Sequence, residues 1–166
     1  SRALFLAGKL VQSSQLLAGA EQMLRSQSKL EAEDAALLPQ ISIYRAAISA
    51  MCGRISEARN LISQVKLPYS TLHLQARAMD TLGLIHELAG EQDAAIKAYL
   101  NASESALAAS VSYLAINARC EAAIVQLAQG RLTEAQESCR GALQMGRSGY
   151  EQIPPTGMAW AILAEI

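Results

Sequence analysis

The sequence has little charge and few aromatic residues. Only 17% of its 166 residues are charged, 4% are aromatic, and the net charge at pH 7 is −1. Such a balance provides no overall positive field that would attract nucleic acid or an anionic membrane surface. The apolar residues, 51% of the chain, are mainly Ala and Leu, whereas a β-sandwich needs Val, Ile and aromatic side chains. The composition therefore predicts an all-α protein with closely packed helices.

Long apolar runs and paired cysteines are also missing. No run approaches the roughly 20 residues that cross a bilayer, and no basic and then apolar leader opens the chain, so we expect a cytoplasmic protein without membrane contact. The three cysteines, Cys52, Cys120 and Cys139, are odd in number and have no C-x-x-C spacing. This pattern predicts small buried side chains in a reducing compartment instead of disulfides.

No pattern typical of an enzyme is present. The sequence contains no Gly-x-Ser-x-Gly, no H-E-x-x-H and no cluster of His and Cys ligands. His73 and His86, the only histidines, lie about 20 Å apart along one predicted helix and cannot share a metal ion. We expect His86 to be a partly buried structural residue. The sequence predicts a protein without enzymatic activity, cofactor or metal, although a site completed by further domains stays open.

What the sequence does contain is an apolar helix, a glycine turn and a second apolar helix over residues 82–102. Small residues at Gly83, Ala95 and Ala102 would let the two helices approach closely, and Tyr99 would fill the space between them. Gly90 would end the first helix, because glycine adopts a positive φ without strain. The unit is therefore predicted to be an antiparallel helix pair.

Two polar residues are predicted to be N-caps, each for the second helix of a helix pair. Asp93 stands where the N-cap after Gly90 is expected, and its carboxylate could accept a hydrogen bond from a free backbone amide. Thr133, with Gln136 three residues later, has the spacing of a capping box. Both assignments place a helix start three residues after a turn glycine.

The helix pair recurs along the chain. Turn glycines at 8, 53, 90 and 130 are separated by 37 to 45 residues, a period typical of an α-solenoid. We expect one repeat domain over residues 1–166, cut within a repeat at both ends and therefore prone to self-association. Its units are approximately 1–26, 35–66, 69–108, 110–147 and 154–166. Residues 27–34 are predicted to be a polar link, and Pro39 to mark the start or a kink of the next helix.

These motifs resemble the tetratricopeptide repeat. The resemblance is carried by Leu82-Gly83, Gly90, Ala95, Tyr99 and Ala102. The units are longer than the usual 34 residues, and the turns Gly8-Lys9-Leu10 and Gly130-Arg131-Leu132 are similar to those in the sensor region of MalT-type, LuxR-family bacterial transcriptional activators. The resemblance covers essentially the whole chain and implies a right-handed α-solenoid of antiparallel helix pairs.

The resemblance also implies a function. In that family a repeat region lies between a nucleotide-binding module and a DNA-binding domain, receives a small-molecule inducer or a regulatory protein, and controls self-association. This chain has no phosphate-binding loop at Gly8-Lys9 and no basic recognition helix, so we expect no direct nucleic-acid contact by this segment. The alternative is a general protein–protein interaction scaffold without a transcriptional role.

A ligand or partner would bind in the groove that the first helix of each pair lines. The register of Leu82-Gly83 assigns five polar residues to it: Gln40, Arg77, Asp80, Glu87 and Asn117. The same register turns Cys120 inward. Arg77 and Asp80 could instead pair with each other, a contact worth a few tenths of a kcal/mol. The mixed polar and apolar lining suits a small molecule or an amphipathic helix.

Overall fold

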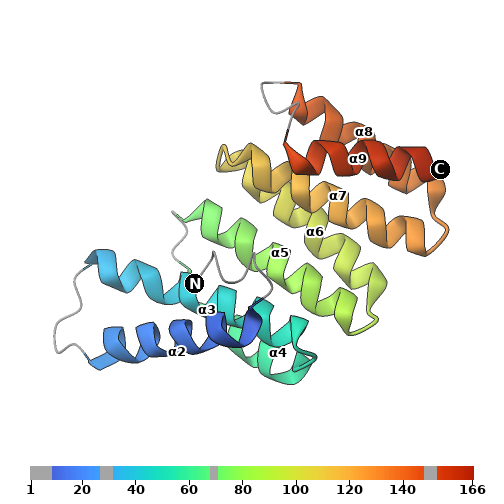
Figure 1. Cartoon of the computed structure of the whole chain (residues 1–166). Coiled ribbons are helices and arrows are strands. Elements are labelled where there is room, and N and C mark those ends of the chain that lie inside the picture. Colours follow the sequence, from blue (N-terminus) through green and yellow to red (C-terminus); the bar gives the residue numbers. More distant parts are fainter. Residues whose placement is uncertain (1–8, 27–31, 68–70, 148–152) are drawn as a thin grey trace. The chain divides into compact units, whose positions relative to one another are not determined.

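The structure is a computed structural model that describes residues 9–26, 32–67, 71–147 and 153–166 (Figure 1). These residues form eight helices and no strand, which confirms the all-α prediction. Helices that follow one another in the chain pack against each other within two compact units, Ser1–Leu67 (unit 1) and Pro68–Ile166 (unit 2). No helix in the described ranges is long and apolar enough to cross a membrane.

The described residues of unit 1 form three helices. They are α2 (Leu10–Ser26), α3 (Ala32–Met51) and α4 (Ile55–Ser63), and α3 packs against both of the others. Leu17 of α2 is buried against Ile41 and Ile48 of α3. The apolar positions of these two helices thus form the small core of the unit.

The beginning of α3 differs from the sequence prediction. The helix starts at Ala32, so Glu33 and Asp34 belong to its first turn, while residues 27–31 lie outside the described residues. Pro39 is inside the helix and does not start it. A proline there removes one helical hydrogen bond, and the burial of Ile41 and Ile48 just after it stabilises the helix through tertiary packing.

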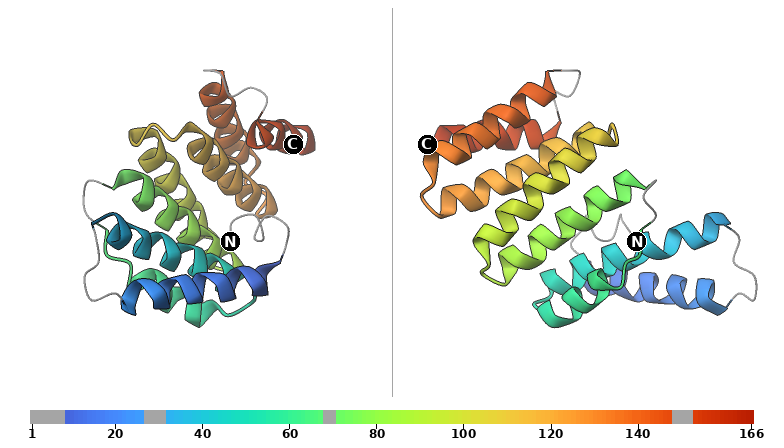
Figure 2. Two further views of the ribbon diagram at one scale, coloured as in Figure 1. Left: turned by 60° about the vertical axis from the view of Figure 1, so that its left-hand side comes forward. Right: turned by 180° about the vertical axis from the view of Figure 1, so that it is seen from behind.

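In unit 2 the described ranges 71–147 and 153–166 form five helices, which lie in two layers (Figures 1 and 2). The bounds are α5 (Leu72–Leu88), α6 (Gln92–Ala108), α7 (Ser112–Ala128), α8 (Leu132–Gly146) and α9 (Pro154–Glu165). Helix α6 packs against α5 and α7, and α8 packs against α7 and α9. Helix α7 also contacts α5 and α9, so that α5, α7 and α9 form one layer and α6 and α8 the other.

The close approach of α5 and α6 has the predicted cause. A Cβ atom on Gly83 would lie 2.6 Å from Cδ1 of Tyr99, closer than a side chain allows. Ala95 and Ala102 of α6 are fully buried, and only 2% of Tyr99 is exposed. The tyrosine ring therefore occupies the space that the missing side chain of Gly83 leaves.

The glycine turns also agree with the prediction. Gly53, Gly90 and Gly130 have φ values of +77°, +78° and +71°. At Gly90 the amide of Glu91 donates to the carbonyl of His86 at 2.8 Å and the amide of Gly90 to that of Glu87 at 2.9 Å, the pair of bonds that defines a Schellman motif. Gly8 lies outside the described residues.

A fourth turn of this kind has no glycine. Between α6 and α7, Ser110 has a φ of +57°, and the amide of Val111 donates to the carbonyl of Ala106 at 2.8 Å. Backbone in this region favours glycine, so Ser110 is strained. The chain therefore uses one turn geometry after four of its helices, including one where sequence inspection finds no signal.

The two predicted caps are wrong. The N-cap residues are Glu91 for α6 and Arg131 for α8, and neither side chain forms a capping hydrogen bond. Each N-cap lies one residue after its turn glycine, two residues earlier than predicted, which puts Asp93 and Thr133 inside the first turn. Asp93 instead accepts a hydrogen bond from Nη1 of Arg131 at 2.9 Å and so links the starts of α6 and α8.

The prediction for the cysteines is confirmed at two of three positions. Cys120 and Cys139 are fully buried in one apolar cluster with Ile116. Burial raises the pKa of the Cys120 thiol to about 12, so the thiol is a poor nucleophile. Cys52 is exposed, because it follows the last residue of α3 at a turn, where no helix covers it.

Candidate functional site

Three carboxylic side chains of unit 2 lie close together, and we call them the acidic cluster: Asp80 and Glu87 from α5, and Glu121 from α7. Asp80 and Glu87 are seven residues apart, which places them on one face of the helix. All three residues are partly buried. The charges of Asp80 and Glu87 both raise the pKa of Glu121, so the three groups interact across the α5–α7 contact.

Burial changes the acidity of two members of the cluster. It raises the pKa of Asp80 to about 6, although the positive charge of Arg77 acts in the opposite direction. The pKa of Glu121 is raised to about 7, first by burial and then by the charges of Asp80 and Glu87. Glu121 therefore carries a proton for part of the time near neutral pH.

Asp80 has an unusual environment. Its Oδ1 atom is buried and has no hydrogen-bond partner among the described residues. A buried polar atom without a partner costs on the order of 1–3 kcal/mol and is uncommon in folded proteins. The cluster thus contains a group whose bonding capacity the surrounding chain does not use.

Tyr99 connects the cluster to α6. Its hydroxyl donates a hydrogen bond of 2.7 Å to Oε2 of Glu87. Burial, together with this bond, raises the pKa of Tyr99 well above its usual range, so the hydroxyl remains protonated and acts as a donor. The residue that fills the Gly83 gap also fixes the position of one carboxylate.

The structure brings together part of the predicted site. Arg77, Asp80 and Glu87 lie on α5 as expected, and the charge of Arg77 acts on Asp80. Asn117 is partly buried on the neighbouring α7. Gln40 is partly buried on α3 and belongs to unit 1, whereas the acidic cluster belongs to unit 2.

The sequence prediction did not include Glu121. Cys120, expected on the inward face, is instead buried in the core, and its thiol donates to the carbonyl oxygen of Pro155 at 3.2 Å. A signal was available, because Arg119 and Glu121 are the only charged residues of α7.

His86 is the structural residue that the sequence predicts. It is partly buried near the end of α5, and its Nδ1 lies 2.6 Å from Oε2 of Glu91 in the following turn. His73 is exposed near the start of the same helix. Within the described ranges no three His, Cys, Asp or Glu side chains are placed to hold a metal ion.

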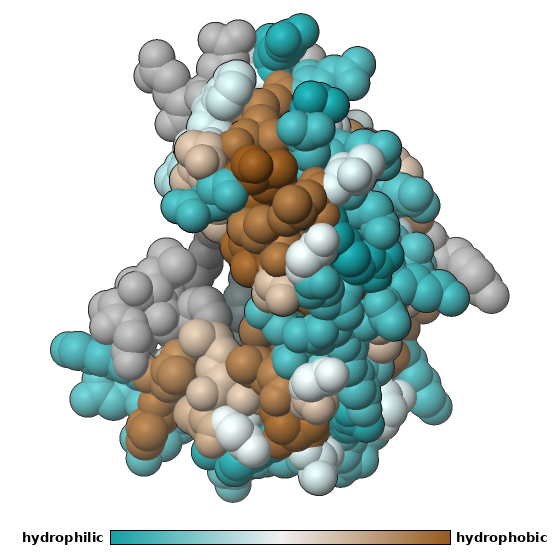
Figure 3. Space-filling view, turned by 90° about the vertical axis from the view of Figure 1, so that its right-hand side faces the viewer, coloured by the Kyte–Doolittle hydropathy of each residue, from teal (hydrophilic) through white to brown (hydrophobic). Residues whose placement is uncertain are grey.

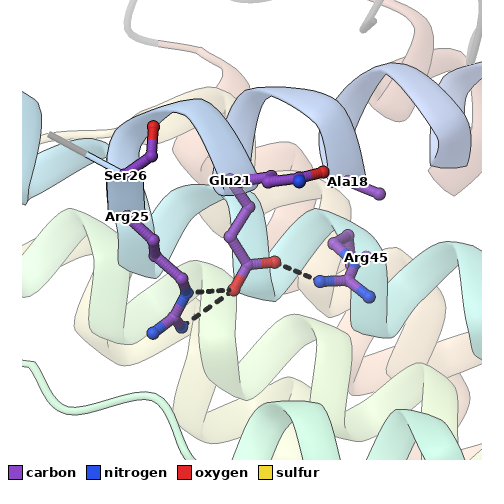
Figure 4. A pocket seen from close by; sticks show the side chains of 6 residues that line it. Ala18, Glu21, Arg25, Ser26 and Arg45 are labelled. Carbon is purple, nitrogen blue, oxygen red and sulfur yellow. Dashed lines mark hydrogen bonds and ion pairs between the residues drawn. The ribbon is translucent and has the colours of Figure 1, made fainter.

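Unit 1 has a separate pocket of about 440 Å³ between α2 and α3 (Figure 4). Glu21 lies at its centre, and its two carboxylate oxygens accept hydrogen bonds from Arg25 on α2 and from Arg45 on α3. Burial alone would raise the pKa of Glu21, but the two arginines outweigh it and lower the pKa. Glu21 thus pairs with both arginines, and its bond to Arg45 stabilises the α2–α3 contact.

Apolar side chains are exposed at the carboxyl end of unit 2, on the face shown in Figure 3. Trp160 of α9 is 62% exposed and lines a pocket of about 280 Å³ with Arg147 and Thr156. Ile166, which follows α9, is 38% exposed. This end of the unit therefore presents a mainly apolar surface with one aromatic side chain.

The comparisons identify no relative. No family model, no curated protein and no solved structure matches the chain. Its functional assignment therefore depends on the residues described above and on the sequence resemblance.

Proposed function

We propose that this chain is the sensing segment of a bacterial transcriptional regulator, of the MalT-type, LuxR-family kind. In this proposal it is a right-handed tetratricopeptide-like solenoid without enzymatic activity. It binds a small-molecule inducer or a regulatory protein and thereby controls self-association of the activator. The turns at Gly90 and Gly130 and the packing of Tyr99 on Gly83 support the repeat assignment, because these are positions that carry the sequence resemblance.

The observation that carries the binding role is the acidic cluster. Asp80 and Glu121 are held at a cost, since burial disfavours their charged forms and one oxygen of Asp80 has no partner. A residue arrangement that lowers stability in this way is more frequent at functional sites than elsewhere. A ligand with an amine or guanidinium group would offset the cost. We therefore favour a positively charged inducer or a basic segment of a partner protein.

The test is a ligand screen that monitors thermal unfolding, with light scattering to follow the mass. The wild-type chain is screened against amines, guanidines and uncharged analogues of the same size. We expect a charged compound to raise the unfolding temperature and to change the oligomeric state. The variant Asp80→Asn/Glu121→Gln should lose the response, while Glu137→Gln, an exposed position on α8, should keep it. A response that survives the double variant places binding elsewhere and contradicts the proposal.

A general protein-interaction scaffold is the second candidate. The exposed Trp160 on α9 favours it, because tryptophan is enriched where proteins meet. The two candidates predict different neighbouring domains in the full-length gene product. A phosphate-binding loop before this segment and a helix-turn-helix domain after it would support the regulator, and a gene product without both would leave the scaffold.

A further inference from the structure

The pocket between α2 and α3 carries an excess of positive charge. Among the described residues that line it, Glu21 is the only carboxylate, and it faces two guanidinium groups, from Arg25 on α2 and from Arg45 on α3 (Figure 4). In the same part of the chain no charged group other than these two arginines shifts the pKa of Glu21. The three side chains together therefore leave one positive charge uncompensated at the pocket.

Glu21 uses only part of the donor capacity of the two arginines. Its Oε1 accepts a hydrogen bond of 3.0 Å from Nε of Arg25 and lies 2.8 Å from Nη2, while its Oε2 accepts one from Nη1 of Arg45. The described ranges provide no acceptor for Nη1 of Arg25 or for Nε and Nη2 of Arg45. A guanidinium group has five N–H donors in a planar fork, so both arginines keep donors for a further anion.

The geometry of the pocket lets one anion reach both arginines. The carboxylate of Glu21 already bonds to the two guanidinium groups at once, although they come from different helices. Only 12% of the Glu21 side chain and 25% of the Arg45 side chain is exposed, whereas 64% of Arg25 is exposed. Arg45 is thus held at the α2–α3 contact, and Arg25 leaves the pocket accessible from water.

The size and charge of the pocket favour a phosphate group on a small molecule. The volume of about 440 Å³ lies in the range of small-molecule sites. Arginine forks match the oxygens of phosphate in bidentate geometry. A phosphate monoester has close to two negative charges at pH 7 and so balances two guanidinium groups, whereas a monocarboxylate only repeats the charge of Glu21. Gln22 and Ser26 also line the pocket and offer polar groups to the rest of the molecule.

We propose that Arg25 and Arg45 form a binding site for the phosphate group of a small phosphomonoester, and that Glu21 occupies this site when no ligand is present. Binding turns the Glu21 carboxylate out into water and places the phosphate between the two guanidinium groups. The site does not depend on the acidic cluster, which belongs to unit 2 and attracts cations. The chain thus has a second binding site, with the opposite charge preference.

The experiment is a calorimetric titration of the full chain with glycerol 3-phosphate at low salt. Glu21→Gln removes the competing carboxylate and should bind about three- to tenfold more tightly than the wild type. Arg25→Gln and Arg45→Gln should each bind about tenfold more weakly or worse. Arg140→Gln, at an exposed position on α8, removes the same charge and should bind like the wild type. An unchanged or lower affinity of Glu21→Gln, or an equal loss in Arg140→Gln, would overturn the site.

NMR of the wild-type chain keeps the test decisive if a variant folds poorly. The Nε–Hε signals of Arg25 and Arg45 should shift as glycerol 3-phosphate is added, while the signal of Arg140 stays in place. Unchanged signals of Arg25 and Arg45 would contradict the proposal. Acetate should bind about tenfold more weakly, and equal affinity would overturn the phosphate preference. A phosphoserine peptide that binds more than about tenfold more tightly than glycerol 3-phosphate would replace the small molecule by a protein ligand.

Discussion

Replacing Gly83 by Ala tests the packing on which unit 2 depends. The new Cβ would lie 2.6, 2.7 and 2.9 Å from Cδ1, Cε1 and Cγ of Tyr99, so the ring has to move. Overpacking of this kind costs about 1–3 kcal/mol. Displacing the ring also strains the hydrogen bond from Tyr99 to Glu87, worth about 1 kcal/mol. The higher helix propensity of Ala offsets about 1 kcal/mol. We expect a net loss of about 1–3 kcal/mol in the free energy of unfolding.

Urea denaturation followed by circular dichroism measures this loss, and hydrogen exchange of the α6 amides assigns it to unit 2. Gly157→Ala is the matched control, because Gly157 also lies in a helix but has no atom within 4 Å of a Cβ at its position. The control should gain about 0.5–1 kcal/mol. In a Tyr99→Ala background, Gly83→Ala should no longer destabilise. A Gly83→Ala variant as stable as the Gly157→Ala control would refute the packing argument.

Three further predictions concern other parts of the chain. Ser110→Gly should stabilise unit 2 by about 0.5–1 kcal/mol in thermal unfolding, because the φ of +57° suits glycine; a lower unfolding temperature would contradict this geometry. Glu21→Gln should destabilise unit 1 by about 1 kcal/mol in urea, because Arg25 and Arg45 lose their charged partner, and unchanged stability would show that the cluster contributes nothing. Thiol reagents should label Cys52 rapidly in the folded chain and reach Cys120 and Cys139 only on unfolding, and labelling of all three at one rate would contradict the burial pattern.

The sequence predicted those features that depend on residue size and on glycine. Gly83 and Tyr99 are complementary in volume, and a turn with positive φ selects glycine. Both features can therefore be recognised from the residue types alone. The turn at Ser110 was not predicted, because a serine occupies the position with positive φ. Glu121 was not predicted either, because its place in the acidic cluster depends on the packing of α7 against α5, which a local pattern does not contain.

The predicted caps show a second limit. A polar residue three positions after a glycine has the spacing of an N-cap, but Glu91 and Arg131 already occupy that position, directly after the turn. The side chains of Asp93 and Arg131 then bind each other and not the backbone. Such a bond joins residues from different helix pairs, and a local sequence pattern does not contain that information.

Trp160 gives the chain an intrinsic optical probe. It is the one tryptophan in the sequence, and it stands 62% exposed on α9, beside the apolar end of unit 2. Indole emission shifts to shorter wavelength when water is removed from around the ring. Any protein or second copy that covers this end of the unit would therefore change the colour of the fluorescence, whereas a ligand confined to the acidic cluster would leave it unaltered. One spectrum, without a label, thus separates the two surfaces.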